Sequence, residues 1–326
     1  MASVTEIGMP MVGLGCWKAQ KIEEVVYNAI KVGYRHIDSA AAYGNEKEVG
    51  AGIRRAIQEG LCTRGDLWVT SKLWNTYHRR EHVPMACQRT LDDLGLDFVD
   101  LYLIHQPIAL AYVPFDAYYP PKWTDQPGNA GKIILDRVPY RETWEAMEAL
   151  QEVGKAKHIG VSNVNVQLLM DLLSYCKIKP AVNQIESHVY LQQPGLVAFC
   201  QAHGICVTAY SPLGAKSYLG IGLASAEDDC FLEPLLTSIA EKHSKTVGQV
   251  VLRFQLQRGC SIIPKSQNVD RLKENLDVFG FELSAEEMEA IKGLERNRRF
   301  SDPAEYTRAW GAPGSAIALA GLPIFS

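Results

Sequence analysis

The sequence predicts a single (β/α)8 barrel, the fold called a TIM barrel, and three observations support this prediction. Short hydrophobic runs alternate with amphipathic helical segments along the 326 residues, and such alternation implies a parallel sheet. Eight of these runs can be counted, which is the number that closes a barrel. No linker divides the chain, so residues 1–326 are expected to form one domain.

The first half of the chain supplies four of the predicted strands. An apolar segment before the first strand is expected to be an N-terminal β segment at the barrel floor. The connection 106–138 is far longer than a usual βα loop, and its many aromatic residues favour an ordered lid over disorder. The predicted strands cover 11–16, 34–38, 67–72 and 98–104, and the predicted helices cover 22–31, 46–58 and 81–94.

The second half repeats the pattern and adds a helix. A second long loop, rich in small residues, covers 214–229. The capping box at Ser284 predicts an extra C-terminal helix, and the tail from Arg296 is expected to lie across one rim. Strands are predicted at 157–161, 181–185, 205–210 and 260–263, and helices at 140–153, 167–175, 195–203, 234–242 and 247–257.

Composition excludes several classes of protein. The net charge is −4, so no global field attracts nucleic acid or an anionic membrane. No stretch approaches the roughly 20 apolar residues of a membrane span. The eight cysteines are scattered without a Cys-x-x-Cys pair, which argues against a zinc site or a disulfide framework and favours the cytoplasm. Cys16 is singled out because it ends the first predicted strand. The chain is expected to be a monomer or a homodimer.

Four polar residues stand where hydrophobic strands end. Asp38, Lys72 and His105 each close a predicted strand, and Tyr43 follows Asp38 in the next loop. The carboxyl ends of barrel strands form the catalytic face, so these side chains are expected to meet. A nearby ammonium paired with a carboxylate is expected to lower the pKa of the tyrosine, while the imidazole orients a carbonyl oxygen. Together they suit protonation of a carbonyl that receives a hydride.

A hydride must come from a nicotinamide cofactor, because no side chain can supply one. The run Gly13-Leu14-Gly15-Cys16-Trp17-Lys18 lacks the third glycine of the usual dinucleotide fingerprint. Lys265 and Arg271 instead bracket a predicted helix N-terminus with Asn268 as its N-cap, which makes an anion site. A phosphate on the adenosine ribose would fit there, so NADPH is favoured over NADH.

The chain resembles the aldo-keto reductases over nearly its whole length, and the xylose reductases most. Several ordered motifs carry this resemblance, which is more specific than any one of them. They are Gly13–Lys18, Asp38-Ser39-Ala40, Tyr43-Gly44-Asn45-Glu46, Thr70–Asn75, Asp100–His105, Gly160-Val161-Ser162-Asn163, Ala209–Gly214, Ile263-Pro264-Lys265-Ser266, Arg299–Pro303 and Pro323-Ile324-Phe325.

The resemblance implies a role for each matching residue. Tyr43 is implied to be the proton donor, with Lys72 and Asp38 as its tuning pair and His105 to orient the carbonyl of a small substrate. Trp17 and Trp74 are implied to wall the substrate pocket. The cofactor is implied to contact Cys16, Trp17 and Asp38, with Ser162, Asn163 and Gln184 on the carboxamide, Tyr210 on the ring, Ser211 and Leu213 near the pyrophosphate, Lys265, Ser266, Asn268 and Arg271 on the ribose phosphate, and Glu274 and Asn275 on adenine.

Three departures from the xylose reductase pattern weaken the assignment of xylose itself. Ala42 stands where yeast xylose reductases have an acidic residue, directly before Tyr43. Ser301 replaces an asparagine of the tail motif, and Gln106 replaces an aromatic residue after His105. The implied reaction remains reduction of an aldehyde, an aldose such as xylose, with NADPH.

Other interpretations of the same residues stay open. Asp38 and Lys72 alone would more often be a structural salt bridge, and the tryptophans alone would more often be packing residues. Lys72 could instead form the Schiff base of a barrel aldolase or lyase. A third possibility is a regulatory barrel that binds the nicotinamide with little turnover. The joint position of the four polar residues at the barrel mouth favours the reductase.

Overall fold

Eight parallel strands form one sheet in sequence order, β1 to β8, as the single barrel predicts. The computed structural model describes residues 7–127 and 131–303. A parallel bridge between Val12, just before the first strand, and Ile262 of the last strand closes the barrel. The strands are β1 (Leu14–Gly15), β2 (His36–Asp38), β3 (Trp68–Leu73), β4 (Val99–Ile104), β5 (Ala156–Ser162), β6 (Val182–Glu186), β7 (Cys206–Tyr210) and β8 (Cys260–Ile262).

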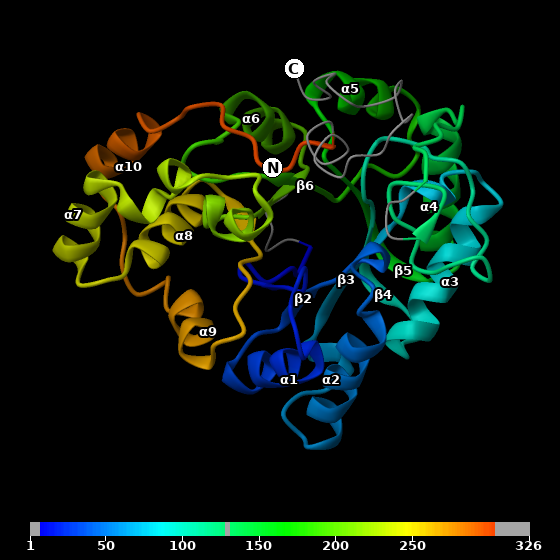
Figure 1. Cartoon of the computed structure of the whole chain (residues 1–326), viewed down its shortest axis with the longest axis horizontal. Coiled ribbons are helices and arrows are strands. Elements are labelled where there is room, and N and C mark those ends of the chain that lie inside the picture. Colours follow the sequence, from blue (N-terminus) through cyan, green and yellow to red (C-terminus); the bar gives the residue numbers. More distant parts are fainter. Residues whose placement is uncertain (1–6, 128–130, 304–326) are drawn as a thin grey trace.

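Helices surround the strands as an outer ring (Figure 1). All the predicted helices are present, with ends that shift by about one residue. Apolar side chains at helical spacing bury one face of each helix against the sheet. The helices are α1 (Ile22–Val32), α2 (Glu46–Gln58), α3 (His82–Leu94), α4 (Tyr140–Glu152), α5 (Val166–Tyr175), α6 (Pro194–Ala202), α7 (Pro234–His243), α8 (Val247–Gln257), α9 (Val269–Leu276) and α10 (Ala285–Lys292).

The barrel floor is filled by a residue that precedes β1. Met9 is 2% exposed and packs with Trp68, Leu101, Leu103 and Val182 from three strands. The described residues 7–11 form a turn and an irregular stretch rather than a strand. The floor is therefore covered as predicted, but residues 7–11 do so without a β segment, and residues 1–6 lie outside the described part.

The glycine-rich start of the chain serves barrel closure. Gly13 N donates to Ile262 O at 2.8 Å, and Gly15 N donates to Pro264 O at 3.1 Å. A Cβ added at Gly15 would lie 2.6 Å from Ile263 O, so only glycine allows this approach of the two backbones. The two glycines are therefore explained by the packing of the backbone here, and they are not part of a dinucleotide fingerprint.

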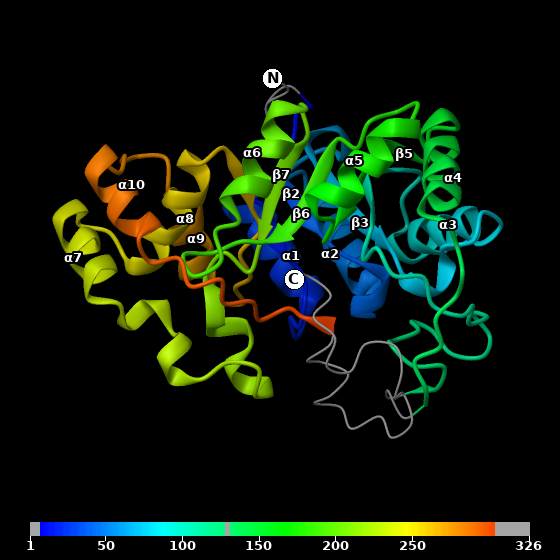
Figure 2. The same ribbon diagram turned by 90° about the horizontal axis from the view of Figure 1, so that it is seen from above.

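Both long loops project from the same end of the barrel, the end where the strands finish (Figure 2). The loop after β4 is pinned by a bridge between Leu110 and Leu135 and by aromatic contacts such as Tyr77 with Phe115, whose ring centres lie 5.1 Å apart. The loop after β7 contains four short 3₁₀ helices between Gly214 and Leu232. In the described residues, no helix is long and apolar enough to span a membrane.

Candidate active site

The strand ends bring the four predicted catalytic residues together around one buried ammonium. Lys72 Nζ, on β3, donates to Asp38 Oδ1 at 2.6 Å, to Ser39 O at 2.8 Å and to Tyr43 Oη at 3.3 Å. The Lys72 and Asp38 side chains are 0% and 1% exposed. Gln184 Nε2 donates to the other carboxylate oxygen of Asp38 at 2.7 Å. These hydrogen bonds hold the charge pair in place beside Tyr43.

The protonation of Tyr43 differs from the sequence-based expectation of a lowered pKa. Burial, followed by the Asp38 carboxylate, raises the pKa of Tyr43 well above its usual value. The depth of the site causes this correction, because desolvation disfavours a phenolate more than the ammonium favours it. Tyr43 therefore keeps its proton at neutral pH. The ammonium 3.3 Å away can still stabilise the phenolate that forms once the proton leaves.

His105 lies beside Tyr43 and is neutral. Its ring centre lies 5.8 Å from that of Tyr43 and 5.2 Å from that of Trp74. Burial, with the charges of Lys72 and Lys122, lowers the pKa of His105 well below its usual range. A neutral imidazole carries one N–H, which can donate to a carbonyl oxygen without a charge in the pocket.

A hydrogen-bonded network connects the residues expected around the nicotinamide. Tyr210 Oη donates to Asn163 Oδ1 at 2.7 Å. Asn163 Nδ2 donates to His105 O at 2.9 Å and to Ser162 Oγ at 3.0 Å, and Ser162 Oγ donates to Gln184 O at 2.8 Å. Asn163 has φ +61°, a left-handed conformation that turns its amide toward these partners. The network fixes the ends of β5, β6 and β7 relative to His105.

The wall after β7 is held by an aromatic contact. Ser211, with φ +50°, shares a hydrogen bond of 2.9 Å with Tyr218 Oη. The centre of the Tyr218 ring lies 5.7 Å from that of the Trp17 ring, so the loop after β7 contacts the loop after β1. Leu213 completes this wall of the cavity. The contact between these two loops borders the cavity.

The predicted phosphate site lies at the start of α9. Asn268 Oδ1 accepts from the backbone N–H groups of Asp270 and Arg271 at 2.8 and 3.1 Å, so Asn268 is the N-cap as predicted. Lys265 and Arg271 are exposed, and neither forms an ion pair within residues 7–127 and 131–303. Ser266, Glu274 and Asn275 complete this end. Two unpaired cations at a helix N-terminus suit an anionic group.

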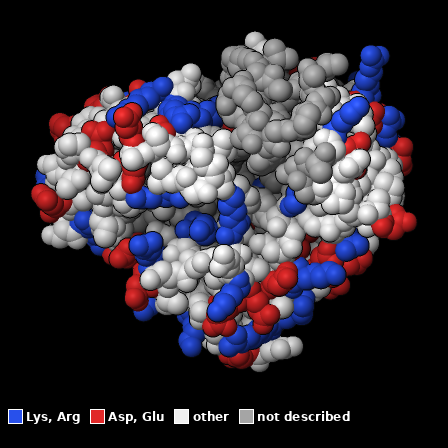
Figure 3. Space-filling view, in the orientation of Figure 1, with Lys and Arg blue, Asp and Glu red and all other residues white. Residues whose placement is uncertain are grey.

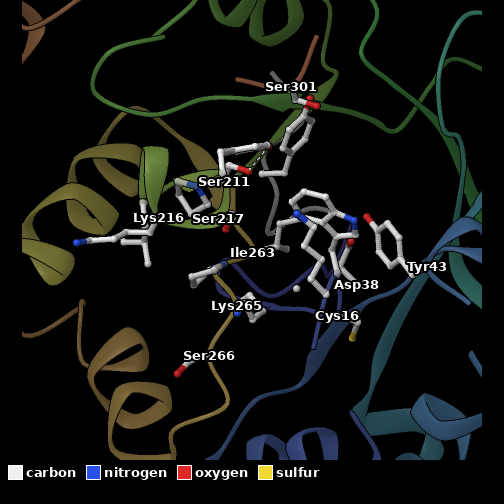
Figure 4. Close-up of a pocket in the computed structure, with 18 of the residues that line it drawn as sticks. Cys16, Asp38, Tyr43, Ser211, Lys216, Ser217, Ile263, Lys265, Ser266 and Ser301 are labelled. Carbon is white, nitrogen blue, oxygen red and sulfur yellow. Dashed lines mark hydrogen bonds between the residues drawn. The ribbon is translucent and has the colours of Figure 1, made fainter. Parts of the chain in front are cut away.

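One cavity of about 1060 Å³ joins these parts. Figure 4 shows Tyr43 and Asp38 on one side of it, Lys216 and Ser211 across from them, and Lys265 and Ser266 toward α9. Every predicted site residue lines it except Lys72, which lies behind Tyr43 and Asp38. Cys16 is one of these lining residues, but burial raises the pKa of its thiol, so it is not a reactive thiolate.

Three groups that bear on the site were missed in the sequence. Lys18, which lines the cavity, has its pKa lowered by burial and by Lys265, so two ammonium groups face the same space. Lys122 comes from the loop after β4. Glu186 accepts from the backbone N–H groups of Phe300 and Ser301, each at 2.8 Å, and so fastens the tail to the mouth. Only Lys18 had a signal in the sequence, since it follows Trp17 in the first motif.

Comparisons with known proteins agree with this geometry. Residues 7–296 match the model of the aldo/keto reductase family. The chain is similar to the NADPH-dependent D-xylose reductase of Meyerozyma guilliermondii, with 48% identity over 92% of this chain and 95% of the relative. It is also similar to the NADH-dependent D-xylose reductase of Candida parapsilosis, with 46% identity over 92% and 93%.

Solved structures agree as well. The aldo-keto reductase of Bombyx mori in complex with NADP superposes with a TM-score of 0.79, at 40% identity over 91% of this chain and 93% of that one. The aldose reductase of Schistosoma japonicum superposes with a TM-score of 0.80, at 39% identity over 89% and 90%. With the barrel, the contact of Tyr43 with the buried Lys72–Asp38 pair and the family match in agreement, the chain belongs to the aldo/keto reductase family.

Proposed function

We propose that the chain reduces an aldehyde, an aldose such as xylose, to the corresponding alcohol with NADPH. The observation that carries this proposal is the hydrogen bond of 3.3 Å between a protonated Tyr43 and the buried Lys72 ammonium, at the wall of a cavity that ends in an anion site. The xylose reductases named above, which are similar over more than nine-tenths of this chain, support the same reaction.

The residues present fit a phosphorylated nicotinamide cofactor. Lys265 and Arg271 at the start of α9 would hold the ribose phosphate, and Tyr210 with Asn163 and Ser162 would hold the nicotinamide end. Lys18, which lines the same cavity, adds a further positive charge. When bound, the reduced nicotinamide supplies the hydride, which no side chain can supply.

The side chains supply the proton and the orientation. A neutral His105 would donate its N–H to the carbonyl oxygen and hold it near Tyr43 Oη. As the carbonyl carbon gains the hydride, its oxygen takes the proton of Tyr43. Lys72, held by Asp38, would stabilise the resulting phenolate through the charge-assisted contact. The burial of Lys72 and Asp38 strengthens the electrostatic interaction between them.

The aldolase or lyase alternative fits the geometry less well. A Schiff base needs an unprotonated amine that can reach a carbonyl. Lys72 is fully buried, and its ammonium already donates to Asp38, Ser39 and Tyr43. Treatment with borohydride and substrate is therefore expected to trap no covalent adduct on Lys72. A cytoplasmic location, and a monomer or homodimer, remain predictions of this proposal.

The direct test is a screen of NADPH oxidation with xylose, other aldoses, sugar phosphates and simple aldehydes, repeated with NADH. Turnover with at least one aldehyde, faster with NADPH than with NADH, is the expected result. A protein that binds NADPH but oxidises it with no aldehyde would contradict the proposed reaction and would support the regulatory barrel.

A further inference from the structure

The substrate side of the cavity contains an ammonium group that the reductase chemistry does not use. Lys122 lies in the loop after β4 and lines the cavity next to Trp123. Trp74 Nε1 donates to Lys122 O at 3.1 Å, which fixes the backbone of this lysine over the site. Its ammonium donates to the carbonyl oxygen of Ala42, the residue directly before Tyr43. The positive charge is therefore held beside the proton donor.

No carboxylate of residues 7–127 and 131–303 neutralises the Lys122 ammonium. It forms no ion pair within the described residues. The acidic residues that line the described cavity are Asp38 and Glu274. Both oxygens of Asp38 are engaged, by Lys72 and Gln184, and Glu274 lies on α9 at the phosphate end. Residue 42 is an alanine, so it contributes no carboxylate either.

The charge of Lys122 changes the pKa of another side chain that lines the cavity. It is one of the two charges that lower the pKa of His105, and burial lowers the pKa of Lys122 itself. An ammonium has three N–H donors, and Ala42 O takes one, so two remain for a ligand. Figure 3 shows blue basic atoms bordering the hollow at the centre of this face. A partly desolvated cation with spare donors favours an anion.

A polar acceptor also lines the cavity. Gln106 follows His105, lines the cavity and is 6% exposed, and its Oε1 has no hydrogen-bond partner among the described residues. A ligand hydroxyl could donate to this oxygen. The cavity thus offers an acceptor for a hydroxyl, directly after His105 in the chain, and a cation for an anionic group, bonded to the residue before Tyr43.

We propose that the preferred substrates are polyhydroxy aldehydes that carry an anionic group, a carboxylate or a phosphate, and that Lys122 binds this group. The inference rests on the proposed reductase function and names its substrate class. Lys122 acts in recognition and takes no part in proton or hydride transfer. A uronate and a sugar phosphate share the chemistry that Lys122 recognises.

The test compares three substrates of similar size with saturating NADPH, namely glucose, glucuronate and glucose 6-phosphate. Wild-type protein is expected to show a higher kcat/KM with one or both anionic sugars than with glucose. Lys122→Met, which keeps the length of the side chain without its charge, is expected to lower that kcat/KM about 10- to 100-fold. The value with glucose should change less than about threefold, and Lys122→Arg should retain the preference.

The matched control is Lys132→Met, an exposed lysine of the same loop, which should leave all three values unchanged. The pattern between the two anionic sugars identifies the group as carboxylate or phosphate. Equal losses with all three substrates in Lys122→Met would mean that the lysine only fastens the loop to Ala42, and would overturn the inference. Wild-type protein that reduces glucose as well as the anionic sugars would overturn it too. No NADPH oxidation with any aldehyde, glucose and simple aldehydes included, would instead overturn the proposed function.

Discussion

The two ends of the cavity hold their charged side chains in opposite ways. At the catalytic end, Lys72 and Asp38 are almost fully buried, and each is bonded to neighbours that the barrel itself supplies. At the phosphate end, Lys265 and Arg271 are exposed and unpaired within the described residues. The charge pair beside Tyr43 is thus fixed by folding, whereas the cations proposed to bind the cofactor have no ion-pair partner among the described residues.

This contrast predicts that the catalytic end is coupled to fold stability. Glu46 lies behind it, fully buried, and accepts hydrogen bonds from Ser71 at 2.6 Å and Thr90 at 3.2 Å. Burial raises the pKa of Glu46 to about 8. Ser71 directly precedes Lys72 on β3, so this carboxyl supports the strand that carries the ammonium.

The largest expected effect on stability is therefore a pH-dependent gain in Glu46→Gln. Between the pKa of an unfolded glutamate and about 8, the folded chain keeps a proton that the unfolded chain loses, so wild-type stability falls as the pH rises. Glutamine does not titrate, so the variant should gain on the order of 3 kcal/mol relative to wild type between pH about 5 and about 9. Urea unfolding at several pH values measures this difference.

The control for this prediction is Glu48→Gln, an exposed glutamate on the same helix, which should track wild type at every pH. A Glu46→Gln variant whose stability difference from wild type is the same at low and high pH would show that Glu46 is ionised in the folded chain. Water would then reach the catalytic end more readily than its geometry indicates.

A smaller effect is expected at the phosphate end, and it should concern binding alone. Lys265→Ala combined with Arg271→Ala should weaken the binding of NADPH about 10- to 100-fold, because two exposed cations are lost. NADH affinity should change less than about threefold, and the free energy of unfolding should stay near that of wild type. Fluorescence titration with each cofactor measures both affinities.

Lys273→Ala serves as the control for the double variant, because Lys273 lies on the same helix and pairs with Asp270 at 3.7 Å outside the cavity. Equal losses of affinity for NADH and for NADPH in the double variant would contradict the assignment of this end to the ribose phosphate. A large loss of stability would contradict the proposed contrast between the two ends.

The fold could be predicted because each element has a local signal. Hydrophobic periodicity located all eight strands and the helices, and strand ends marked Asp38, Lys72 and His105. β1 has only two residues, Leu14 and Gly15, although the prediction covered 11–16. Gly13 and Gly15 bond to Ile262 and Pro264, and such contacts, distant in the sequence, carry no local signal.

The parts of the site that could not be predicted depend on tertiary contacts. The path of the loop after β4 is set by contacts such as that of Trp74 with Lys122 O, so nothing in the sequence placed this lysine in the cavity. Glu186 gave no signal because its partners, Phe300 and Ser301, are more than a hundred residues away. The pKa of Tyr43 depends on how deeply the ring is buried, which composition and spacing do not reveal.

The central claim is that Tyr43 gives its proton to the carbonyl oxygen beside the buried ammonium. Tyr43→Phe, which removes only the hydroxyl, tests it most directly when the rate of NADPH oxidation is measured in a single turnover with a saturating aldehyde. The rate should fall about 10²- to 10⁴-fold relative to wild type, while the affinity for NADPH changes less than about threefold. A Tyr43→Phe protein that oxidises NADPH at the wild-type rate would contradict the claim.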